Sequence, residues 1–433
     1  MRILIAPVEV SGIAGGLKAG FDRIGIEAEI VFSQPHPFAY RRAATRRLVP
    51  RIWLGLASAR FAAGRGRLGK ALLLLAWKAW SVMVLAWALA RFDGFVFLHG
   101  NTLTNTRLEA WLLARLGKKV VVIYCGSDAR PPYVDGQVYW DTSRNSPANV
   151  ARLAAMRSER IALHERYGFI CVNSPFTGQF HAAPYVSWFA MGIPRAFADA
   201  RDASDAGVRP GPAVRILHSP SNPPLKGTPR ITELVEGLKS RGHAVELVLL
   251  RNVPHHQVLS EVAKADLIVD QIYSDTPMAG FAGEAAHCGK AVLVAGYAAG
   301  EELGETIRAT PPPTLFVHPD GVGEALERLV SDEAFRKALG RQVRDFVDSH
   351  WSAEAVAGRY LRLLTDGPPE AWTIAPEAVS YVHGGGLAEA DARKFVAELL
   401  RSCGPGALHL DHKPALREAF VAFAEGRDAE PSP

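Results

Sequence analysis

The chain has 433 residues, of which 48% are hydrophobic and 21% are charged, and its net charge is +5. This length exceeds one ordinary domain, and this composition excludes extensive disorder while supplying apolar residues for two or three cores. The cysteines Cys125, Cys171, Cys288 and Cys403 are too widely spaced for a paired metal-ligand motif or a dense disulfide framework, so they favour a reducing, cytoplasmic location. Residues 1–7 predict a β-strand and no signal peptide.

The positive charge is concentrated in the first half of the chain. Residues 1–200 contain 25 Lys and Arg against 12 Asp and Glu, and the remainder contains 24 against 32. Between Glu29 and Asp93 there is no acidic residue. Such a run is either a solvated surface or a contact for an anionic partner such as membrane lipid. Nucleic acid is disfavoured because no recognition motif accompanies the run. Its basic residues are Arg41, Arg42, Arg46, Arg47, Arg51, Arg60, Arg65, Arg67, Lys70, Lys78 and Arg91.

Apolar runs and helical periodicity alternate along the first 200 residues. This alternation predicts a parallel α/β sheet. The predicted strands are residues 2–7, 28–32, 94–98, 119–124 and 169–173, and the predicted helices are residues 106–116 and 149–167.

Residues 71–90 form an apolar segment of nearly the length that spans a bilayer. Strand signals resume at Gly94, so a spanning helix would divide one sheet between two sides of a membrane, which excludes that interpretation. Trp77, Trp80, Val84 and Trp87 form one helical stripe. Two interpretations remain: a helix of the core, or a helix lying in the membrane interface and anchored by the basic residues 41–91.

A second α/β alternation follows a linker. We assign residues 1–200 to a first domain and the Pro/Gly-rich residues 201–212 to the linker. Residues 213–365 form a second domain, and residues 366–433 form an extension with two predicted helices and no assigned role. Strands are predicted at 214–218, 244–250, 267–270 and 291–295, with helices after Gly227 and at 255–264, 281–288, 332–350, 352–364, 388–400 and 414–424.

Candidate acceptor-side residues follow strands of the first domain. Glycines between a strand and a helix let backbone amides approach an anion, which makes the loop with Gly12, Gly15 and Gly16 a candidate site or simply a tight turn. His99 ends a strand, where it is either a catalytic group that orients a hydroxyl or a structural histidine. Asp128 either holds an acceptor hydroxyl or pairs with Arg130.

Candidate donor-binding residues follow strands of the second domain. Lys226 stands where its charge could neutralise a diphosphate beside a helix N-terminus, although a surface lysine is an alternative. Glu284 follows a glycine-containing turn and could accept both hydroxyls of a ribose, or could be a surface residue of a first helical turn. The complete predicted set is Ser219, Ser221, Asn222, Lys226, Gly227, Asp275, Thr276, Gly280, Phe281, Ala282, Gly283 and Glu284.

The motif segments at Lys226-Gly227 and at 280–292, together with the helices at 332–364, resemble the retaining group 1 glycosyltransferases. The resemblance covers residues 214–364 and extends weakly to the first half through Gly15-Gly16, His99 and residues 126–130. It implies the GT-B fold, in which two Rossmann-like, doubly wound parallel-sheet domains face each other across a cleft. It also implies a nucleoside-diphosphate-sugar donor, no metal and no cofactor, diphosphate contact by Lys226 and ribose contact by Glu284.

Three positions depart from the family pattern. No arginine precedes Lys226 within a few residues, Thr276 stands where the first glutamate of a pair is expected, and Cys125 replaces a histidine. The expected function is metal-independent hexosyl transfer to a saccharide or lipid-linked acceptor in envelope polysaccharide or glycoconjugate synthesis, in the cytoplasm or on the inner membrane face. The alternative is a catalytically weakened GT-B protein that binds or scaffolds.

Overall fold

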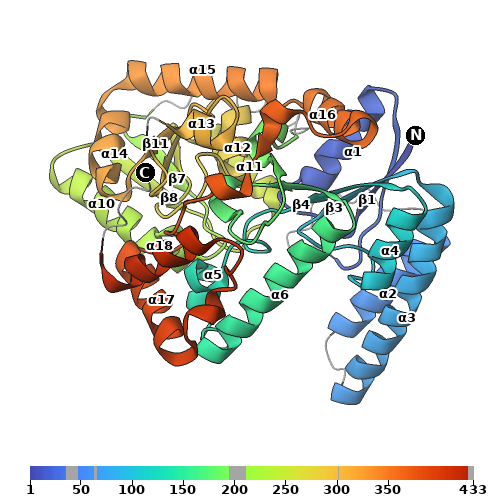
Figure 1. The fold of residues 1–433 in the computed structure, drawn as a ribbon. Coiled ribbons are helices and arrows are strands. Elements are labelled where there is room, and N and C mark those ends of the chain that lie inside the picture. The colour runs from blue at the N-terminus through green and yellow to red at the C-terminus, as the bar shows by residue number, and fades with distance from the viewer. Residues whose placement is uncertain (36–46, 63–65, 195–210, 301, 428–433) are drawn as a thin grey trace.

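The computed structural model describes residues 1–35, 47–62, 66–194, 211–300 and 302–427. Two separate β-sheets with helices on both faces make up the chain (Figure 1). Most of the predicted linker, residues 201–210, lies outside the described residues, as do the basic residues Arg41, Arg42, Arg46 and Arg65. The predicted class, two α/β domains built on parallel sheets, is confirmed.

The first sheet has the strand order β12-β6-β5-β4-β3-β1-β2, and all its strands are parallel except β12. Side chains of β1 alternate between two cores: Ile3 and Ile5 face one, and Leu4 and Ala6 face the other. Both faces are therefore covered by helices, as a parallel sheet requires. The strands are β1 (Arg2–Ala6), β2 (Glu27–Ile30), β3 (Gly94–Leu98), β4 (Lys119–Ile123), β5 (Ile170–Asn173), β6 (Tyr185–Ser187) and β12 (Thr373–Ile374).

The helices of the first domain begin where local signals place them. Thr106, for example, precedes α4 and its hydroxyl accepts a hydrogen bond from the Glu109 amide at 3.2 Å, which is an N-cap. The helices are α1 (Ile13–Arg23), α2 (Leu48–Phe61), α3 (Arg67–Arg91), α4 (Arg107–Arg115), α5 (Gly136–Tyr139), α6 (Pro147–Arg166) and α7 (Trp188–Met191).

Helices α2 and α3 form a hairpin that projects from the first domain (Figure 1). Trp53 of α2 stacks on Trp77 of α3 with ring centroids 5.5 Å apart, and Trp80 Nε1 donates to the Val49 carbonyl at 2.9 Å. By length and composition α3 could cross a membrane, with a mean hydropathy of 1.8 over an 18-residue window of which 22% is buried. The interpretation of this segment as a core helix therefore holds for its C-terminal part, where Val84, Leu85 and Ala88 are buried, and does not hold for its exposed N-terminal part.

The second sheet has the order β11-β10-β9-β7-β8 with all strands parallel. Chain direction across the sheet reverses between β7 and β9, and ligands of doubly wound sheets bind beyond the carboxyl ends at such a switch point. Its strands are β7 (Val214–His218), β8 (Val245–Leu249), β9 (Leu267–Val269), β10 (Ala291–Ala295) and β11 (Leu315–Val317). Its helices are α9 (Pro223–Lys226), α10 (Thr228–Ser240), α11 (His255–Lys264), α12 (Gly280–His287), α13 (Leu303–Ile307), α14 (Val322–Ser331) and α15 (Glu333–His350).

The C-terminal part of the chain returns to the first domain. Helix α16 (Ala353–Asp366) packs against α1, and β12 adds an antiparallel strand to β6. Helices α17 (Glu389–Cys403) and α18 (Pro414–Glu425) pack together, and α17 also packs on α6 (Figure 1). Residues after 352 therefore complete the first domain, so the predicted end of the second domain at residue 365 is wrong, because α16 packs on the first domain. The predicted extension, residues 366–433, has a structural role in the same domain.

Close packing of α1 on α16 depends on Gly20. A Cβ at this position would lie 2.0 Å from the Ala353 carbonyl oxygen, which belongs to the backbone and cannot rotate away. We expect Gly20→Ala to lower the free energy of unfolding by about 1–3 kcal/mol through overpacking. Urea denaturation measures the difference. Gly358→Ala on α16 is the control, since a Cβ there meets nothing within 4 Å, and it should leave stability unchanged or raise it.

Candidate functional site

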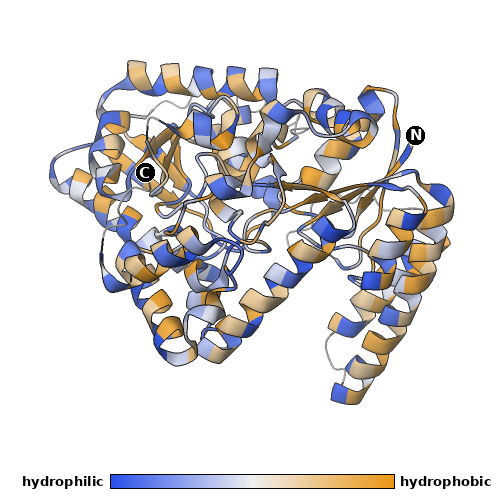
Figure 2. Cartoon of the chain, in the orientation of Figure 1, coloured by the Kyte–Doolittle hydropathy of each residue, from blue (hydrophilic) through white to orange (hydrophobic). Residues whose placement is uncertain are grey.

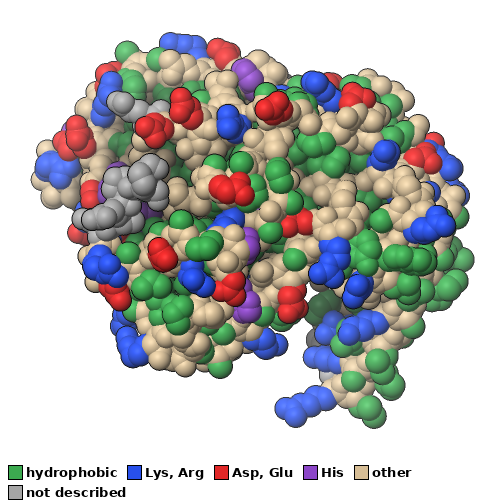
Figure 3. Space-filling view, in the orientation of Figure 1, with side chains coloured by type: hydrophobic (Ala, Val, Ile, Leu, Met, Phe, Trp, Pro, Cys, Tyr) green, Lys and Arg blue, Asp and Glu red, His purple; other side chains and the backbone are tan. Residues whose placement is uncertain are grey.

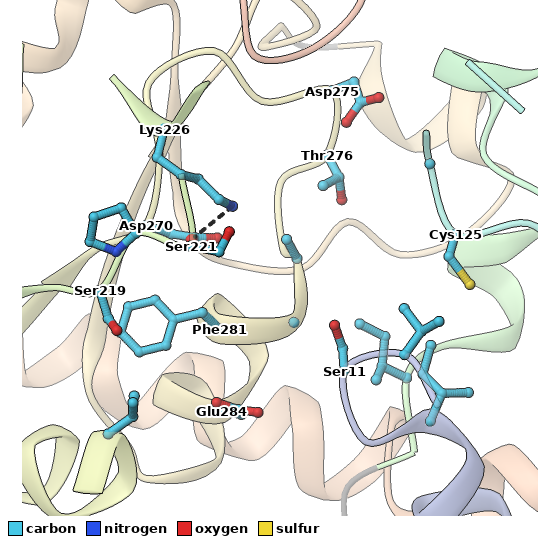
Figure 4. Close-up of a pocket in the computed structure, with 18 of the residues that line it drawn as sticks. Ser11, Cys125, Ser219, Ser221, Lys226, Asp270, Asp275, Thr276, Phe281 and Glu284 are labelled. Atoms are coloured by element: carbon cyan, nitrogen blue, oxygen red, sulfur yellow. Dashed lines mark hydrogen bonds and ion pairs between the residues drawn. The ribbon is translucent and has the colours of Figure 1, made fainter. Parts of the chain in front are cut away.

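A cavity of about 420 Å³ lies between the two domains, where the carboxyl ends of both sheets meet. Figure 4 shows its two walls, with Ser11 and Cys125 on the first domain and Lys226, Asp270 and Glu284 on the second. The main polar residues that line it are Ser11, Ser174, Thr177, Ser219, Ser221, Lys226, Asn252, His255, Asp270, Asp275, Thr276 and Glu284.

Lys226 ends the short helix α9, and its ammonium group points toward the end of β9. Its Nζ donates to Gln271 Oε1 at 2.5 Å and lies 3.5 Å from Asp270 Oδ1. The second carboxylate oxygen of Asp270, Oδ2, is buried and has no hydrogen-bond partner among the described residues. This wall therefore offers a cation beside an unused acceptor, the pair of functions that a phosphate and a hydroxyl group require.

Glu284 is the fifth residue of α12, which begins one residue earlier than predicted. Its side chain is buried, with the residue 4% exposed, so the alternative of a surface glutamate is wrong. His255 Nε2 lies 3.0 Å from Glu284 Oε1 and fixes one carboxylate oxygen in the cavity wall.

His218 at the end of β7 is a structural residue. Its ring nitrogens lie 2.8 Å from the Val269 carbonyl and 2.8 Å from the Thr228 hydroxyl, so the ring joins β7 to β9 and α10. Burial lowers the pKa of His218 to about 4, which keeps the ring neutral at neutral pH. The ring thus holds the two strands that carry Ser219 and Asp270.

The glycine-containing loop after β1 binds a carboxylate of its own chain. Glu9 accepts hydrogen bonds from the amides of Val10 at 2.8 Å, Ala14 at 3.2 Å and Gly15 at 3.1 Å. Burial outweighs these bonds and raises the pKa of Glu9. Amides that were candidates for an external anion are therefore occupied, as expected for a carboxylate at a helix N-terminus.

Ser11 brings this loop to the opposite wall. A Cβ on Gly280 at the start of α12 would lie 2.6 Å from Ser11 Oγ, so the two domains nearly touch at this point. Gly280 is thus required for close approach of the domains, in addition to its predicted role in donor binding.

A buried ion pair crosses between the domains. Arg130 Nε of the first domain donates to Asp275 Oδ2 of the second at 2.9 Å, and Arg130 also pairs with Asp135 at 3.2 Å. Burial opposes the charge of Arg130, but the two carboxylates outweigh it and raise the arginine pKa. The alternative pairing of Asp128 with Arg130 is therefore wrong, and Asp275 holds the domains together at the cavity edge.

Asp128 pairs instead with His99. His99 Nδ1 lies 3.2 Å from Asp128 Oδ1, and the Cys125 amide donates to the same carboxylate at 2.9 Å. The Asp128 charge raises the pKa of His99. Burial acts to raise the pKa of Asp128, but His99 and the Cys125 amide outweigh it and lower that pKa. Neither side chain lines the cavity, although Cys125 and Gly126 beside them do.

Most of the predicted donor-binding residues line this cavity, and the others lie next to lining residues in the sequence. Asn222 precedes α9, and Gly227 has a positive φ of 72° where α9 passes into α10. The predicted residues that line the cavity are Ser219, Ser221, Lys226, Asp275, Thr276, Gly280, Phe281 and Glu284, and those that do not are Gly12, Gly15, Gly16, His99, Asp128, Asn222, Gly227, Ala282 and Gly283.

Several lining residues were not predicted as site residues: Ser11, Ser174, Asn252, His255 and Asp270. Ser174 directly follows β5, Asp270 directly follows β9, and Asn252 lies in the loop after β8. The rule that ligands bind beyond the carboxyl ends of parallel strands could have identified these three. Within the described ranges, no group of three or more His, Cys, Asp or Glu side chains has metal-binding geometry.

No protein-family model and no curated protein sequence matches the chain. An α-glucosyltransferase solved with UDP-glucose and DNA containing an abasic site is similar at 11% identity and a TM-score of 0.49, over 84% of this chain and 100% of that one. WaaG, a glycosyltransferase involved in lipopolysaccharide biosynthesis, is similar at 13% identity and a TM-score of 0.42, over 85% and 100%. Anabaena Alr3699/HepE in complex with UDP and glucose gives 11% and 0.42, over 84% and 100%.

These similarities are similarities of fold, and they do not identify a reaction. The fold and the cavity themselves define a class: a two-domain α/β protein with one ligand cavity shared by both sheets. Its chemistry must be argued from the residues of the cavity.

The His99–Asp128 pair gives a pH-dependent contribution to stability. The raised pKa of His99 means that its contribution is complete below the ordinary histidine pKa of about 6.5 and is lost as pH rises through the folded-state pKa. The lowered pKa of Asp128 means that its contribution is lost only as pH falls through that value. We expect Asp128→Asn to destabilise most at mildly acidic pH, and the difference from wild type to shrink at alkaline pH in urea denaturation. A difference that is independent of pH would contradict the pairing.

Asp275→Asn should destabilise the protein by about 3 kcal/mol, because it leaves the buried Arg130 with one carboxylate partner instead of two. Thermal unfolding is the measurement, and Asp320→Asn, an exposed aspartate of the second domain, is the control. If Asp275 served only a sugar hydroxyl, the variant would lose donor affinity at unchanged stability.

Proposed function

We propose that this protein is a glycosyltransferase that uses a nucleoside-diphosphate sugar. One observation carries the proposal: Lys226 and Glu284 line the same interdomain cavity, at the carboxyl ends of the second sheet. A cation and a buried carboxylate on one wall suit a ligand that combines a diphosphate with vicinal hydroxyl groups. The segments that bring these residues together are those that resemble group 1 glycosyltransferases.

We assign each part of this ligand to a part of the cavity wall. The diphosphate lies near Lys226 and the serines Ser219 and Ser221, and Phe281 and Ala282 in the first turn of α12 add amide groups with no acceptor inside the helix. The ribose hydroxyls bind the Glu284 oxygen that His255 leaves available. Asp270 Oδ2 accepts a further hydroxyl, which compensates for the absent first glutamate.

Transfer breaks the bond between the anomeric carbon and the diphosphate oxygen and forms a bond from that carbon to an acceptor oxygen. The electron pair of the broken bond leaves with the diphosphate, whose departing oxygen takes the proton of the acceptor hydroxyl. Lys226 stabilises the negative charge that develops on this leaving group. Ser11, Cys125 and Gly126 on the opposite wall face the acceptor. The His99–Asp128 pair acts as a positioning pair, since it holds the Cys125 amide and does not line the cavity.

The acceptor we propose is a saccharide or a lipid-linked saccharide, with hexosyl transfer in envelope polysaccharide or glycoconjugate synthesis. The apolar residues of the cavity wall support a saccharide acceptor, and they include Trp188, Phe189 and Ile193 of the first domain. Aromatic side chains offer flat apolar surfaces to sugar rings. The corresponding location is the cytoplasm or the inner face of the membrane.

A non-catalytic binding protein of the same fold is the second candidate. It is favoured by the engagement of Lys226 with Gln271 and Asp270, which a donor diphosphate must displace or share. Calorimetric titration with UDP-, GDP- and ADP-sugars, followed by an assay of donor hydrolysis, separates the candidates. Binding with hydrolysis supports the transferase, and binding without turnover over a range of acceptors supports the second candidate.

Lys226→Met should reduce kcat/KM for the donor about 100-fold, because charge on the leaving diphosphate is no longer stabilised. Donor hydrolysis is measured with the nucleotide that the titration identifies. Lys239→Met on α10 is the matched control: its lysine is exposed and pairs with Glu236 away from the cavity. Equal kinetics in wild type and Lys226→Met would refute the proposed site.

A further inference from the structure

The α2–α3 hairpin, residues 48–61 and 67–91, exposes an unusual amount of apolar surface. On α3 the residues Leu68, Leu72 and Leu75 are 75%, 58% and 64% exposed. Their spacings of four and three place them on one helical face, which Val82 continues at 57% exposed. Soluble proteins rarely leave such a continuous apolar face without a partner.

The opposite face of α3 is already used. Val84, Leu85 and Ala88 belong to the core of the first domain, and Trp77 Nε1 donates to the Ser33 carbonyl at 3.1 Å. The helix is thus fixed by its tryptophan stripe, and the leucine face is left on the outside. Figure 2 shows both helices as mainly hydrophobic segments interrupted by single polar residues.

All charged side chains of the hairpin are cationic. Residues 48–91 contain no Asp or Glu. Among the described residues, none of its outward basic side chains forms an ion pair with a carboxylate. Figure 3 shows blue Lys and Arg side chains along the projecting hairpin beside green hydrophobic ones. These basic residues are Arg51, Arg60, Arg67, Lys70 and Lys78.

The tip of the hairpin combines both properties in one hollow. Arg60 and Lys70 line a space of about 300 Å³ together with Phe61, Ala71 and Leu74. The Arg60 guanidinium lies 5.4 Å from the centre of the Phe61 ring. Two cations beside apolar side chains suit a phospholipid, because the cations can contact its phosphate and the apolar side chains can contact the first carbons of its acyl chains.

We propose that the α2–α3 hairpin docks on the surface of an anionic phospholipid bilayer, with its leucine face in the interface and its cations at the phosphates. The hairpin lies on the bilayer and does not cross it. The 14 residues of α2 extend only about 21 Å, short of the roughly 30 Å hydrocarbon core, and α3 continues into β3 after two residues. Apolar area and cationic charge together give an attachment that neither provides alone.

A second copy of the chain is a poorer occupant of this face. In a symmetric dimer, each hairpin would bring its cations against the cations of the other without any acidic residue to compensate. The proposal is independent of the transferase activity, because membrane binding is measured without a donor sugar.

Co-sedimentation of the full-length protein with vesicles tests the proposal. One vesicle type is phosphatidylcholine with about one third phosphatidylglycerol, and the other is phosphatidylcholine alone. We expect binding to the anionic vesicles that weakens with added salt, and at least about tenfold weaker binding to the neutral ones. The triple variant Leu68→Gln, Leu72→Gln, Leu75→Gln should lose about tenfold or more of this affinity. Arg60→Gln with Lys70→Gln should lose a similar amount of affinity and show a weaker salt dependence, because two of the five cations are removed.

Matched controls use exposed residues elsewhere on the first domain. Leu108→Gln, Leu116→Gln and Met156→Gln together remove comparable exposed apolar area, and Arg115→Gln with Lys119→Gln removes two cations. Both controls should bind vesicles like wild type, and circular dichroism should show all variants folded. The proposal is overturned if wild type binds no anionic vesicles, or if the leucine variant binds like wild type. It is also overturned if sedimentation shows that the wild type is a dimer and that the leucine variant is a monomer. The same holds if the protein binds duplex DNA and no vesicles, and the Arg60 and Lys70 substitutions weaken that DNA binding.

Discussion

Parallel strand pairing places the carboxyl end of every strand at one edge of its sheet, and the cavity depends on this constraint in both domains. In the second sheet the constraint gathers Ser219, Asn252 and Asp270 from the loops after three strands. In the first sheet it gathers Ser11, Cys125 and Ser174 in the same way. The two edges then share one ligand space because the domains approach closely where Ser11 meets Gly280.

The interdomain ion pair of Arg130 with Asp275 stabilises this approach, and it commits the Arg130 charge to carboxylates of the protein. Among the described residues, Lys226 is the only lysine or arginine that lines the cavity. The charge available to an anionic ligand is therefore modest. Amides and hydroxyl groups must contribute a larger share of phosphate binding than they would beside an arginine–lysine pair.

Sequence patterns predicted the strands well because each central strand is a short apolar run bounded by polar or glycine residues. The strand at Val214–His218 agrees at both ends. Strands β6 and β11, of three residues each, were not predicted, and β6 passes directly into α7 without a turn signal at its end. Helix α2 was missed because its arginines and Pro50 obscure an apolar face that forms only against Trp77.

The site was predicted where local sequence specifies it and missed where distant segments meet. Lys226 and Glu284 belong to compact motifs, and both line the cavity. By contrast, Arg130 and Asp275 are 145 residues apart, and nothing in either segment indicates the other. Glu9 illustrates a third case: a glycine-containing turn predicts available amides, but only the structure shows that a neighbouring carboxylate already accepts their hydrogen bonds.

The return of the chain after α15 has a mechanical consequence. The polypeptide passes from the first domain to the second between residues 194 and 211, and it passes back between His350 and Ala353. Two covalent crossings leave the domains fewer degrees of freedom than a single tether would, and this limits the ways in which the two walls of the cavity can separate.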